Sequence, residues 1–334
     1  MLNWIKNFFK SKKFKIDKRT VIIINHSRIN KETLDSVNKG IQIFCMKTAL
    51  AKRFPKLTFI LENEKTSQDD SPSRDTMGWV TLSEIASNKA IIHLNITFLI
   101  EKILRSYKTI SASSFYRELS STATHELTHI IQDKNYKISR RRISTNVNTI
   151  LSLIKKKKKL TLNVKRNEFT KHAFLSLRVM SQKFIFLLLS EGAAEFFGKM
   201  EGKQLYFSTN QHKLEYQYAK SEAIELTRRY NAFLESLTKE KTTKKQLVEI
   251  EHLLSESTYV LGCYMFFTIA YIFNDPYTPE DLLSLKPYQF IKLYEKAELK
   301  NKQTPVVSLR SNLGYFDYNA TIKNWAKTVK ELND

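Results

Sequence analysis

The stretch Ser121-Thr-Ala-Thr-His-Glu-Leu-Thr-His-Ile-Ile-Gln132 carries the pattern on which the predicted fold and function depend. Its residues His125, Glu126 and His129 match H-E-x-x-H. On a helix, residues four apart lie one turn above each other, so both imidazoles can bind one metal ion. Glu126 is rotated by about 100° from His125. This rotation places its carboxylate beside the ion, where a general base is needed.

The surrounding residues predict that this stretch is a buried helix. Neither glycine nor proline occurs from Ser113 to Asp133, and Ser113 or Ser114 can cap the start of the helix. Leu127 and Ile130 supply an apolar face. The alternative is a helix that carries two histidines on its surface, and a second constellation further along the chain argues against it.

That second constellation is Leu188-Leu-Ser-Glu-Gly-Ala-Ala-Glu-Phe-Phe197. A catalytic zinc usually takes three protein ligands, and Glu191 is the candidate for the third. Glu195 follows one helical turn later, where it can accept the second N–H of a ligating histidine, His125. The alternative is an amphipathic helix with two solvated glutamates. The apolar run 184–189 favours a buried carboxylate, which needs a cation.

Together the two constellations resemble the gluzincin zinc metallopeptidases, the thermolysin-like and aminopeptidase-N-like enzymes. The resemblance implies a zincin-like α+β fold, with a small N-terminal sheet lobe, a long active-site helix and a mainly helical C-terminal lobe. It also implies one Zn²⁺ ion held by His125, His129 and Glu191, with Glu195 orienting a ligand histidine.

A third match to this group is Tyr259-Val-Leu-Gly262. The aminopeptidase branch carries Y-x-x-G at a similar distance beyond its ligand glutamate, and its tyrosine stabilises the oxyanion of the tetrahedral intermediate. The resemblance therefore implies that role for Tyr259. Tyr264 and Tyr271 are alternatives, and Tyr259 could instead be a tyrosine at the start of a buried helix.

The chain departs from the gluzincin pattern in two respects. Residues 130–190 separate the histidine pair from Glu191, an interval far longer than in the family, which predicts an insertion. No G-x-M-E-N motif is present, although aminopeptidases use that motif to hold a substrate's free amino end. Its absence argues against exopeptidase activity.

Hydrophobic periodicity predicts an α+β chain in four segments. We expect a basic amphipathic segment (1–18) with a helix over 1–13, an N-terminal lobe (19–133), a basic insertion (134–172) and a helical C-terminal lobe (173–334). The expected strands are 20–25, 57–61, 78–82 and 90–98. The other expected helices are 31–53, two successive helices within 174–197 of which the second carries Glu191, and then 214–237, 244–254, 259–273, 278 onward, 287–299 and 320–332.

The strand over 90–98 precedes the active-site helix, and in zincin-like folds that strand is the edge of the sheet. An extended peptide can add to such an edge through backbone hydrogen bonds. His93 and Asn95 lie on one face of this strand, so we expect them to line or flank the substrate cleft. The alternative for His93 is a histidine whose hydrogen bonds are satisfied within the fold.

The composition limits which cofactors and compartments are plausible. The chain has 334 residues and 42% hydrophobic residues, enough for a substantial core. Its two cysteines, Cys45 and Cys263, lie in apolar runs and predict buried thiols in a reducing compartment. Only seven glycines occur, none adjacent to another, so we expect no nucleotide cofactor. We also expect no run of 18 apolar residues that could span a membrane.

The net charge of +22 is concentrated in two segments. Residues 134–172 contain 13 Lys and Arg against one acidic residue, and residues 1–18 contain six Lys against one Asp. Such segments suit an anionic membrane surface, nucleic acid or an acidic partner. The alternative is a solvated lysine-rich surface. No secretory signal is recognisable, so we expect a cytoplasmic protein, with peripheral membrane attachment as an alternative.

These observations predict a zinc-dependent metallopeptidase that hydrolyses peptide bonds. The metal, held by His125, His129 and Glu191, lowers the pKa of a bound water, and Glu126 is the general base. Two alternatives stay open: a zinc hydrolase acting on a non-peptide amide or ester, and a basic membrane- or nucleic-acid-associated binding protein with a structural zinc. A fourth protein ligand, with His172 or Glu195 as the candidates, would favour the structural zinc.

Overall fold

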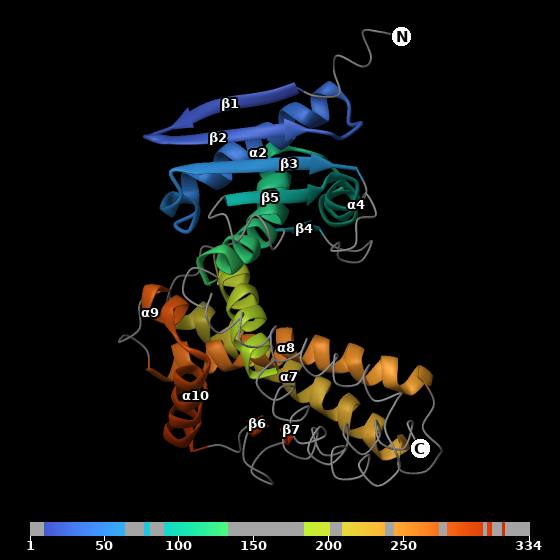
Figure 1. Cartoon of the computed structure of the whole chain (residues 1–334), viewed down its shortest axis with the longest axis vertical. Coiled ribbons are helices and arrows are strands. Elements are labelled where there is room, and N and C mark those ends of the chain that lie inside the picture. Colours follow the sequence, from blue (N-terminus) through green and yellow to red (C-terminus); the bar gives the residue numbers. More distant parts are fainter. Residues whose placement is uncertain are drawn as a thin grey trace, which may run out of the picture. The chain divides into compact units, whose positions relative to one another are not determined.

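The computed structural model of the chain describes residues 10–63, 77–80, 90–132, 184–200, 209–237, 244–273, 279–302, 306–308 and 316–317. By its contacts the chain divides into two compact units. Unit 1 comprises Met1–Asn135 and Ala194–Tyr206, and unit 2 comprises Tyr136–Ala193 and Phe207–Asp334. The described elements form an α+β structure, mostly helical with a small mixed sheet, which confirms the predicted class (Figure 1).

Unit 1 contains a five-stranded sheet in the order β1-β2-β3-β5-β4. Its strands are β1 (Lys10–Ile16), β2 (Arg19–Asn25), β3 (Lys56–Glu62), β4 (Gly78–Trp79) and β5 (Ala90–Asn95). β2, β3 and β5 are parallel, whereas β1 and β4 run antiparallel to their neighbours. A parallel pair needs a crossover connection, and α2 (Lys31–Lys47) supplies it between β2 and β3.

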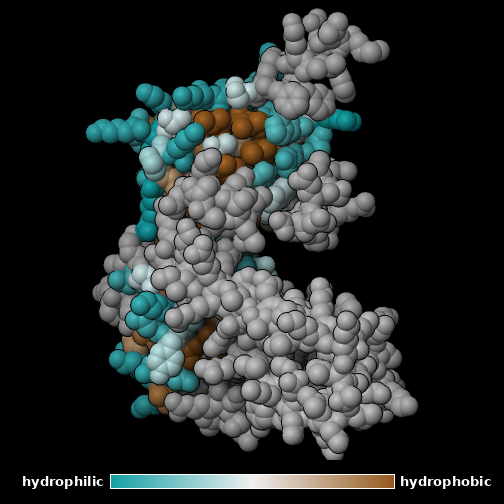
Figure 2. Space-filling view, viewed as in Figure 1, coloured by the Kyte–Doolittle hydropathy of each residue, from teal (hydrophilic) through white to brown (hydrophobic). Residues whose placement is uncertain are grey.

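The two faces of this sheet differ in burial. Val21, Ile23 and Phe59 are fully buried on the face that α2 covers, where the Phe44 ring of α2 lies edge-on to Phe59 at 6.1 Å. The alternate residues of the strands form the opposite face, on which several isoleucines are only partly buried: Ile22, Ile24, Ile60 and Ile91. Figure 2 shows hydrophobic residues exposed over the strands of this unit, with hydrophilic residues around them.

Three predicted boundaries in unit 1 are wrong. Residues 10–16 form β1 instead of the end of a helix, because their alternating pattern pairs along its whole length with β2; residues 1–9 lie outside the described part. The strand predicted over 90–98 ends at Asn95, whose side chain caps α4 (Ile96–Tyr107) by accepting the Phe98 N–H at 3.1 Å. The helix predicted over 31–53 ends at Lys47 and is followed by the short 3₁₀ helix η1 (Ala51–Arg53).

The predicted edge of the sheet is also wrong. β5 does not form the edge, because β4 pairs with it antiparallel, Trp79 opposite His93 and Gly78 opposite Leu94. The strand predicted over 78–82 is thus only two residues long, and within the described residues it is β4 that ends the sheet.

The described part of unit 2 is mainly helical. It contains α7 (Thr209–Leu237), α8 (Lys244–Phe273), α9 (Pro279–Ser284), α10 (Pro287–Asn301) and the short strands β6 (Val307–Ser308) and β7 (Phe316–Asp317). The two helices predicted over 244–254 and 259–273 are one continuous α8, since neither glycine nor proline interrupts the residues between them. The basic insertion 134–172 and the helix predicted over 320–332 lie outside the described residues.

α8 corrects the expectation that no segment is long and apolar enough to cross a membrane. Its window Glu256–Phe273 meets that test by length and composition alone. Core helices of soluble proteins pass the same test, and 67% of this window is buried inside the protein.

Both cysteines are free and buried, as predicted. Burial raises the pKa of the Cys45 thiol to about 12, although the nearby Arg19 guanidinium acts in the opposite direction. The same guanidinium donates a hydrogen bond to the Cys45 carbonyl at 2.9 Å, which ties the start of β2 to the end of α2.

Unit 2 buries a carboxyl group between three elements. The hydroxyls of Tyr264 (α8) and Tyr294 (α10) each donate a hydrogen bond to Glu298 Oε1 at 2.9 Å. The Tyr294 hydroxyl also accepts the Val307 N–H at 3.3 Å, which brings β6 into the same network. Burial raises the pKa of Glu298 despite the two donated hydrogen bonds. The folded protein therefore favours the neutral acid.

This network predicts how stability depends on pH. A carboxyl whose folded pKa is raised contributes stability below its ordinary pKa of 4.5 and loses that contribution as the pH rises through the raised value. Glu298→Gln keeps an oxygen acceptor for both tyrosines but cannot ionise. We expect the unfolding free energy of Glu298→Gln, relative to wild type, to increase between pH 5 and pH 8 in urea titrations. A difference that stays constant with pH would contradict the raised pKa.

Candidate metal centre

The motif helix spans residues 112–132 in unit 1. It begins one residue before the predicted cap region, because Ser111 is the capping residue: the Ser114 N–H donates to Ser111 Oγ at 3.1 Å, and the Ser111 N–H donates to Ser114 Oγ at 2.9 Å. Leu127 is fully buried and Ile130 almost so, as predicted from the apolar face. The helix is therefore held by both its cap and its core packing.

The two motif histidines face each other. Nε2 of His125 and Nε2 of His129 lie 3.1 Å apart, and the two rings are inclined at 78°. Two nitrogens that bind one tetrahedral zinc at about 2.0–2.1 Å lie roughly 3.3 Å apart. The observed separation is thus close to that of two ligands sharing one ion.

Glu191 belongs to the same group of ligand atoms. It lies on the helix over residues 184–200, and its carboxylate oxygen and the two imidazole nitrogens all lie within 4.8 Å of one another. In the part of the chain that the structure describes, this is the one group of three such residues that could hold a metal ion. The donor set of two imidazoles and one carboxylate suits zinc.

Glu195 lies one turn beyond Glu191 and faces His125. Its Oε1 is 3.4 Å from Nδ1 of His125. A carboxylate in this position favours the tautomer with the proton on Nδ1, which leaves the lone pair of Nε2 for a metal. Glu195 is not part of the group of three ligand atoms, and its orienting role stays a prediction.

The close approach of the two helices depends on a glycine that the sequence reasoning did not single out. A Cβ on Gly198 would lie 3.0 Å from the Ser121 carbonyl oxygen and 3.7 Å from the Cβ of His125. Gly192, on the same helix, faces a different neighbour. A Cβ there would lie 2.4 Å from the carbonyl carbon of Gly262 in α8.

The Gly192–Gly262 contact gives the Y-x-x-G element a packing role. A Cβ on Gly262 would lie 2.2 Å from the Leu188 carbonyl oxygen and 2.7 Å from Gly192 Cα. Only hydrogen fits at both positions, so the backbones of α8 and helix 184–200 cross in direct contact. This crossing lies next to Glu191 in sequence, and Tyr259 precedes Gly262 by one helical turn on α8.

The three candidate tyrosines differ in exposure and contacts. Tyr264 is buried and donates to Glu298, and Tyr271 stacks on Tyr216 with ring centroids 4.6 Å apart. Tyr259 is 37% exposed, so its side chain is open to solvent. Of the three, Tyr259 alone combines exposure with a position beside the Gly192–Gly262 crossing.

Glu126 is nearly buried, with 9% of its surface exposed. It follows His125 directly in the motif helix but lies outside the group of three ligand atoms. Its role as a general base stays a prediction.

The predicted cleft residues have structural contacts of their own. His93 stacks on Trp79 of β4 with ring centroids 5.2 Å apart, and its Nδ1 lies 3.5 Å from Glu62 Oε1. Asn95 is buried and caps α4. Their predicted roles in substrate binding stay predictions.

β4, the strand that ends the sheet beside β5, contacts the motif helix. A Cβ on Gly78 would lie 2.7 Å from Cγ2 of Thr122, which precedes His125 by three residues. The two-residue strand was too short for its sequence pattern to reveal this contact. The sheet therefore contacts the helix that carries His125 through β4.

A comparison with protein families supports a zinc-dependent peptidase. The family model described as "Putative zinc dependent peptidase (DUF5700)" matches residues 164–303, less than half of the chain. The matched residues include Glu191, Glu195 and Tyr259, whereas the H-E-x-x-H motif precedes them. No curated protein and no solved structure matches the chain.

The glycine crossing yields a prediction. Gly262→Ala introduces a methyl group into backbone contact, and overpacking of this kind costs about 1–3 kcal/mol or more. We expect a lowered melting temperature and weaker zinc binding by isothermal titration, because the helix that carries Glu191 must shift. Gly198→Ala, whose Cβ has 3.0 Å to its nearest neighbour, should perturb the protein less. Equal stability and zinc affinity of Gly262→Ala and wild type would contradict the close crossing.

Proposed function

We propose that this protein is a gluzincin-type zinc metallopeptidase that holds one zinc ion through His125, His129 and Glu191. The observation that carries the proposal is the convergence of these three ligand atoms within 4.8 Å, with Glu195 against Nδ1 of His125. The family match to residues 164–303, which include Glu191 and Glu195 but not the histidine pair, also supports the zinc-dependent peptidase class.

In the proposed reaction the ion and the protein have different roles. When bound, zinc would act as a Lewis acid that lowers the pKa of a coordinated water and polarises a carbonyl group. Glu126 accepts a proton from the attacking water and delivers it to the nitrogen of the leaving amine. Glu195 keeps the Nδ1 proton on His125, so that Nε2 stays unprotonated as a ligand.

Tyr259 is the proposed donor to the oxyanion of the tetrahedral intermediate. A hydroxyl in this role must be able to reach a substrate, and Tyr259 is 37% exposed, while the Tyr264 hydroxyl is bonded to the buried Glu298. The Gly192–Gly262 contact fixes the α8 backbone beside Glu191. Preorganised donors of this kind stabilise the transition state because they need no reorganisation during the reaction.

The substrate is proposed to bind as an extended strand along β4. Among the described strands β4 ends the sheet, and Gly78 packs on Thr122 of the motif helix. Backbone hydrogen bonds to an edge strand bind a peptide without requiring a particular sequence. The sequence analysis expected a peptide to add to the strand over 90–98. We now propose that it adds to β4, which pairs with that strand.

Digestion of a peptide library by the zinc-loaded protein tests the proposed function. We expect new amino and carboxyl ends in the mass spectra, lost on treatment with a chelator and restored by zinc. Hydrolysis of ester or non-peptide amide substrates, with every peptide intact, would contradict the peptidase assignment and favour a different zinc hydrolase.

Two substitutions separate metal binding from catalysis. Glu126→Gln should keep one zinc per chain by elemental analysis but lower kcat by about 10²–10⁴-fold or more, because the proton acceptor is lost. Glu191→Ala should lose zinc after dialysis, because one of the three ligands is removed. Wild-type turnover by Glu126→Gln would remove Glu126 from the mechanism, and full zinc retention by Glu191→Ala would remove Glu191 from the site.

Tyr259→Phe tests the oxyanion donor. Loss of one such donor typically lowers kcat by about 10²–10³-fold, so we expect a drop of this size with KM and zinc content nearly unchanged. Tyr264→Phe is the matched control: it should reduce stability through the Glu298 network and leave kcat close to wild type. A larger kcat loss in Tyr264→Phe than in Tyr259→Phe would contradict the assignment.

A further inference from the structure

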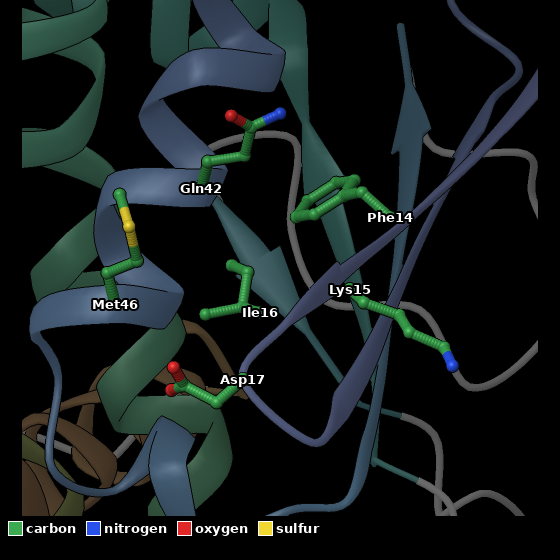
Figure 3. Close-up of a pocket in the computed structure, with 6 residues that line it drawn as sticks. All are labelled: Phe14, Lys15, Ile16, Asp17, Gln42 and Met46. Atoms are coloured by element: carbon green, nitrogen blue, oxygen red, sulfur yellow. The ribbon is translucent and has the colours of Figure 1, made fainter.

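Unit 1 has a shallow groove between the edge strand β1 and helix α2. It has a volume of about 330 Å³ and is lined by Phe14, Lys15, Ile16, Asp17, Gln42 and Met46. Figure 3 shows Phe14 and Ile16 pointing from β1 toward α2, while Lys15 points to the other side of the strand. Gln42 and Met46, one turn apart on α2, form the opposite wall, and Met46 is 50% exposed.

Among the strands that the structure describes, only β2 pairs with β1. β1 pairs with β2 over all seven residues, and within the described residues no strand pairs with its other side. An edge strand of this length presents a row of N–H and C=O groups that can accept a further strand. The groove therefore lies beside a site for strand addition.

The positive charge of β1 determines which kind of strand can pair with its edge. Lys12, Lys13 and Lys15 are exposed on the strand, and Lys18 is exposed in the turn that follows it. Asp17 is already paired with Arg19 at 3.1 Å. A second copy of β1 would place lysines against lysines, which is unfavourable across a strand pair. An acidic strand would instead meet opposite charges.

Apolar and basic residues alternate along the second half of β1, and this alternation indicates the sequence pattern of a strand that could pair with it. Phe14 and Ile16 lie on the groove face, and Lys13 and Lys15 lie on the opposite face. Residues of an added strand that share the groove face would contact apolar side chains and Met46. Residues on its other face would lie beside Lys13 and Lys15. A segment in which acidic and apolar residues alternate satisfies both faces.

We propose that β1 and the groove beside it bind an acidic polypeptide segment, which adds as a strand to the β1 edge and places its apolar side chains against Phe14, Ile16 and Met46. None of the residues in this binding site belongs to the proposed metal centre. The binding proposal therefore does not depend on the proposed peptidase activity.

The test is peptide binding to the full-length Glu126→Gln protein, so that cleavage cannot remove the probe. The probe is a fluorescent seven-residue peptide of alternating glutamate and valine, the length of β1. We expect saturable binding by anisotropy that weakens as salt is added. A peptide with lysine in place of glutamate should not bind, and neither should the acidic peptide after N-methylation at alternate residues.

Protein variants locate the site. Lys13→Glu combined with Lys15→Glu, and separately Met46→Glu, should each weaken binding at least tenfold, with unchanged melting temperatures. Lys213→Glu combined with Lys302→Glu makes the same charge change at exposed positions of unit 2 and should bind like the parent protein. Binding that is insensitive to the β1 and Met46 variants would overturn the proposal, and so would equal binding of the N-methylated peptide.

One further outcome distinguishes a different partner. The proposal expects no β1-dependent sedimentation of the protein with vesicles that contain an anionic phospholipid. Sedimentation that is abolished by the Lys13→Glu and Lys15→Glu pair, together with no peptide binding, would overturn the acidic-peptide proposal in favour of a membrane surface.

Discussion

The contact between Glu195 and His125 is the interaction on which the metal centre depends. At 3.4 Å from Nδ1, the carboxylate orients the imidazole and favours the tautomer in which Nε2 is unprotonated. The same helix carries Glu191 one turn earlier, so the turn spacing that places Glu195 against His125 also directs Glu191 toward the histidine pair. Gly198 allows this approach, because a larger side chain would press on the Ser121 carbonyl.

Glycine also sets the second contact of this helix. Gly192 and Gly262 meet backbone to backbone, and Gly262 is the glycine of the Y-x-x-G element. The element thus combines a packing position and an exposed tyrosine on adjacent turns of α8. The helix that carries the proposed third ligand has close contacts at two points: no Cβ fits at Gly192, and a Cβ at Gly198 would be tight.

Most of the centre could be predicted because its signals are local. His125 and His129 are spaced for one helical face, and Glu191 and Glu195 repeat that spacing on a second helix, so each pair is readable within a few residues. The apolar run before Glu191 indicated a buried carboxylate. Leu188 and Leu189 are fully buried, whereas Glu191 itself is only partly buried. The α+β class followed from the same periodicities.

The helix packing at Gly192, the edge of the sheet and the strand β1 could not be predicted, because they depend on contacts between residues far apart in the sequence. The partner of Gly192 is 70 positions away in α8, and no pattern within a few residues of Gly192 identifies it. β4 has two residues, too few for alternation to show, yet it displaces β5 from the edge of the sheet. The β1 sequence mixes Phe14 and Ile16 with lysines, and that mixture fits a helix stripe as well as an edge strand until β2 pairs with it.

A crystal structure of the zinc-loaded protein, with anomalous data at the zinc absorption edge, tests the central claim most directly. The account predicts one zinc bound by Nε2 of His125, Nε2 of His129 and the Glu191 carboxylate at about 2.0–2.2 Å, with the fourth position open to solvent. It also predicts that the Glu195 carboxylate accepts a hydrogen bond from Nδ1 of His125. A zinc without Glu191 among its ligands, or a fourth protein side chain closing the site, would contradict it.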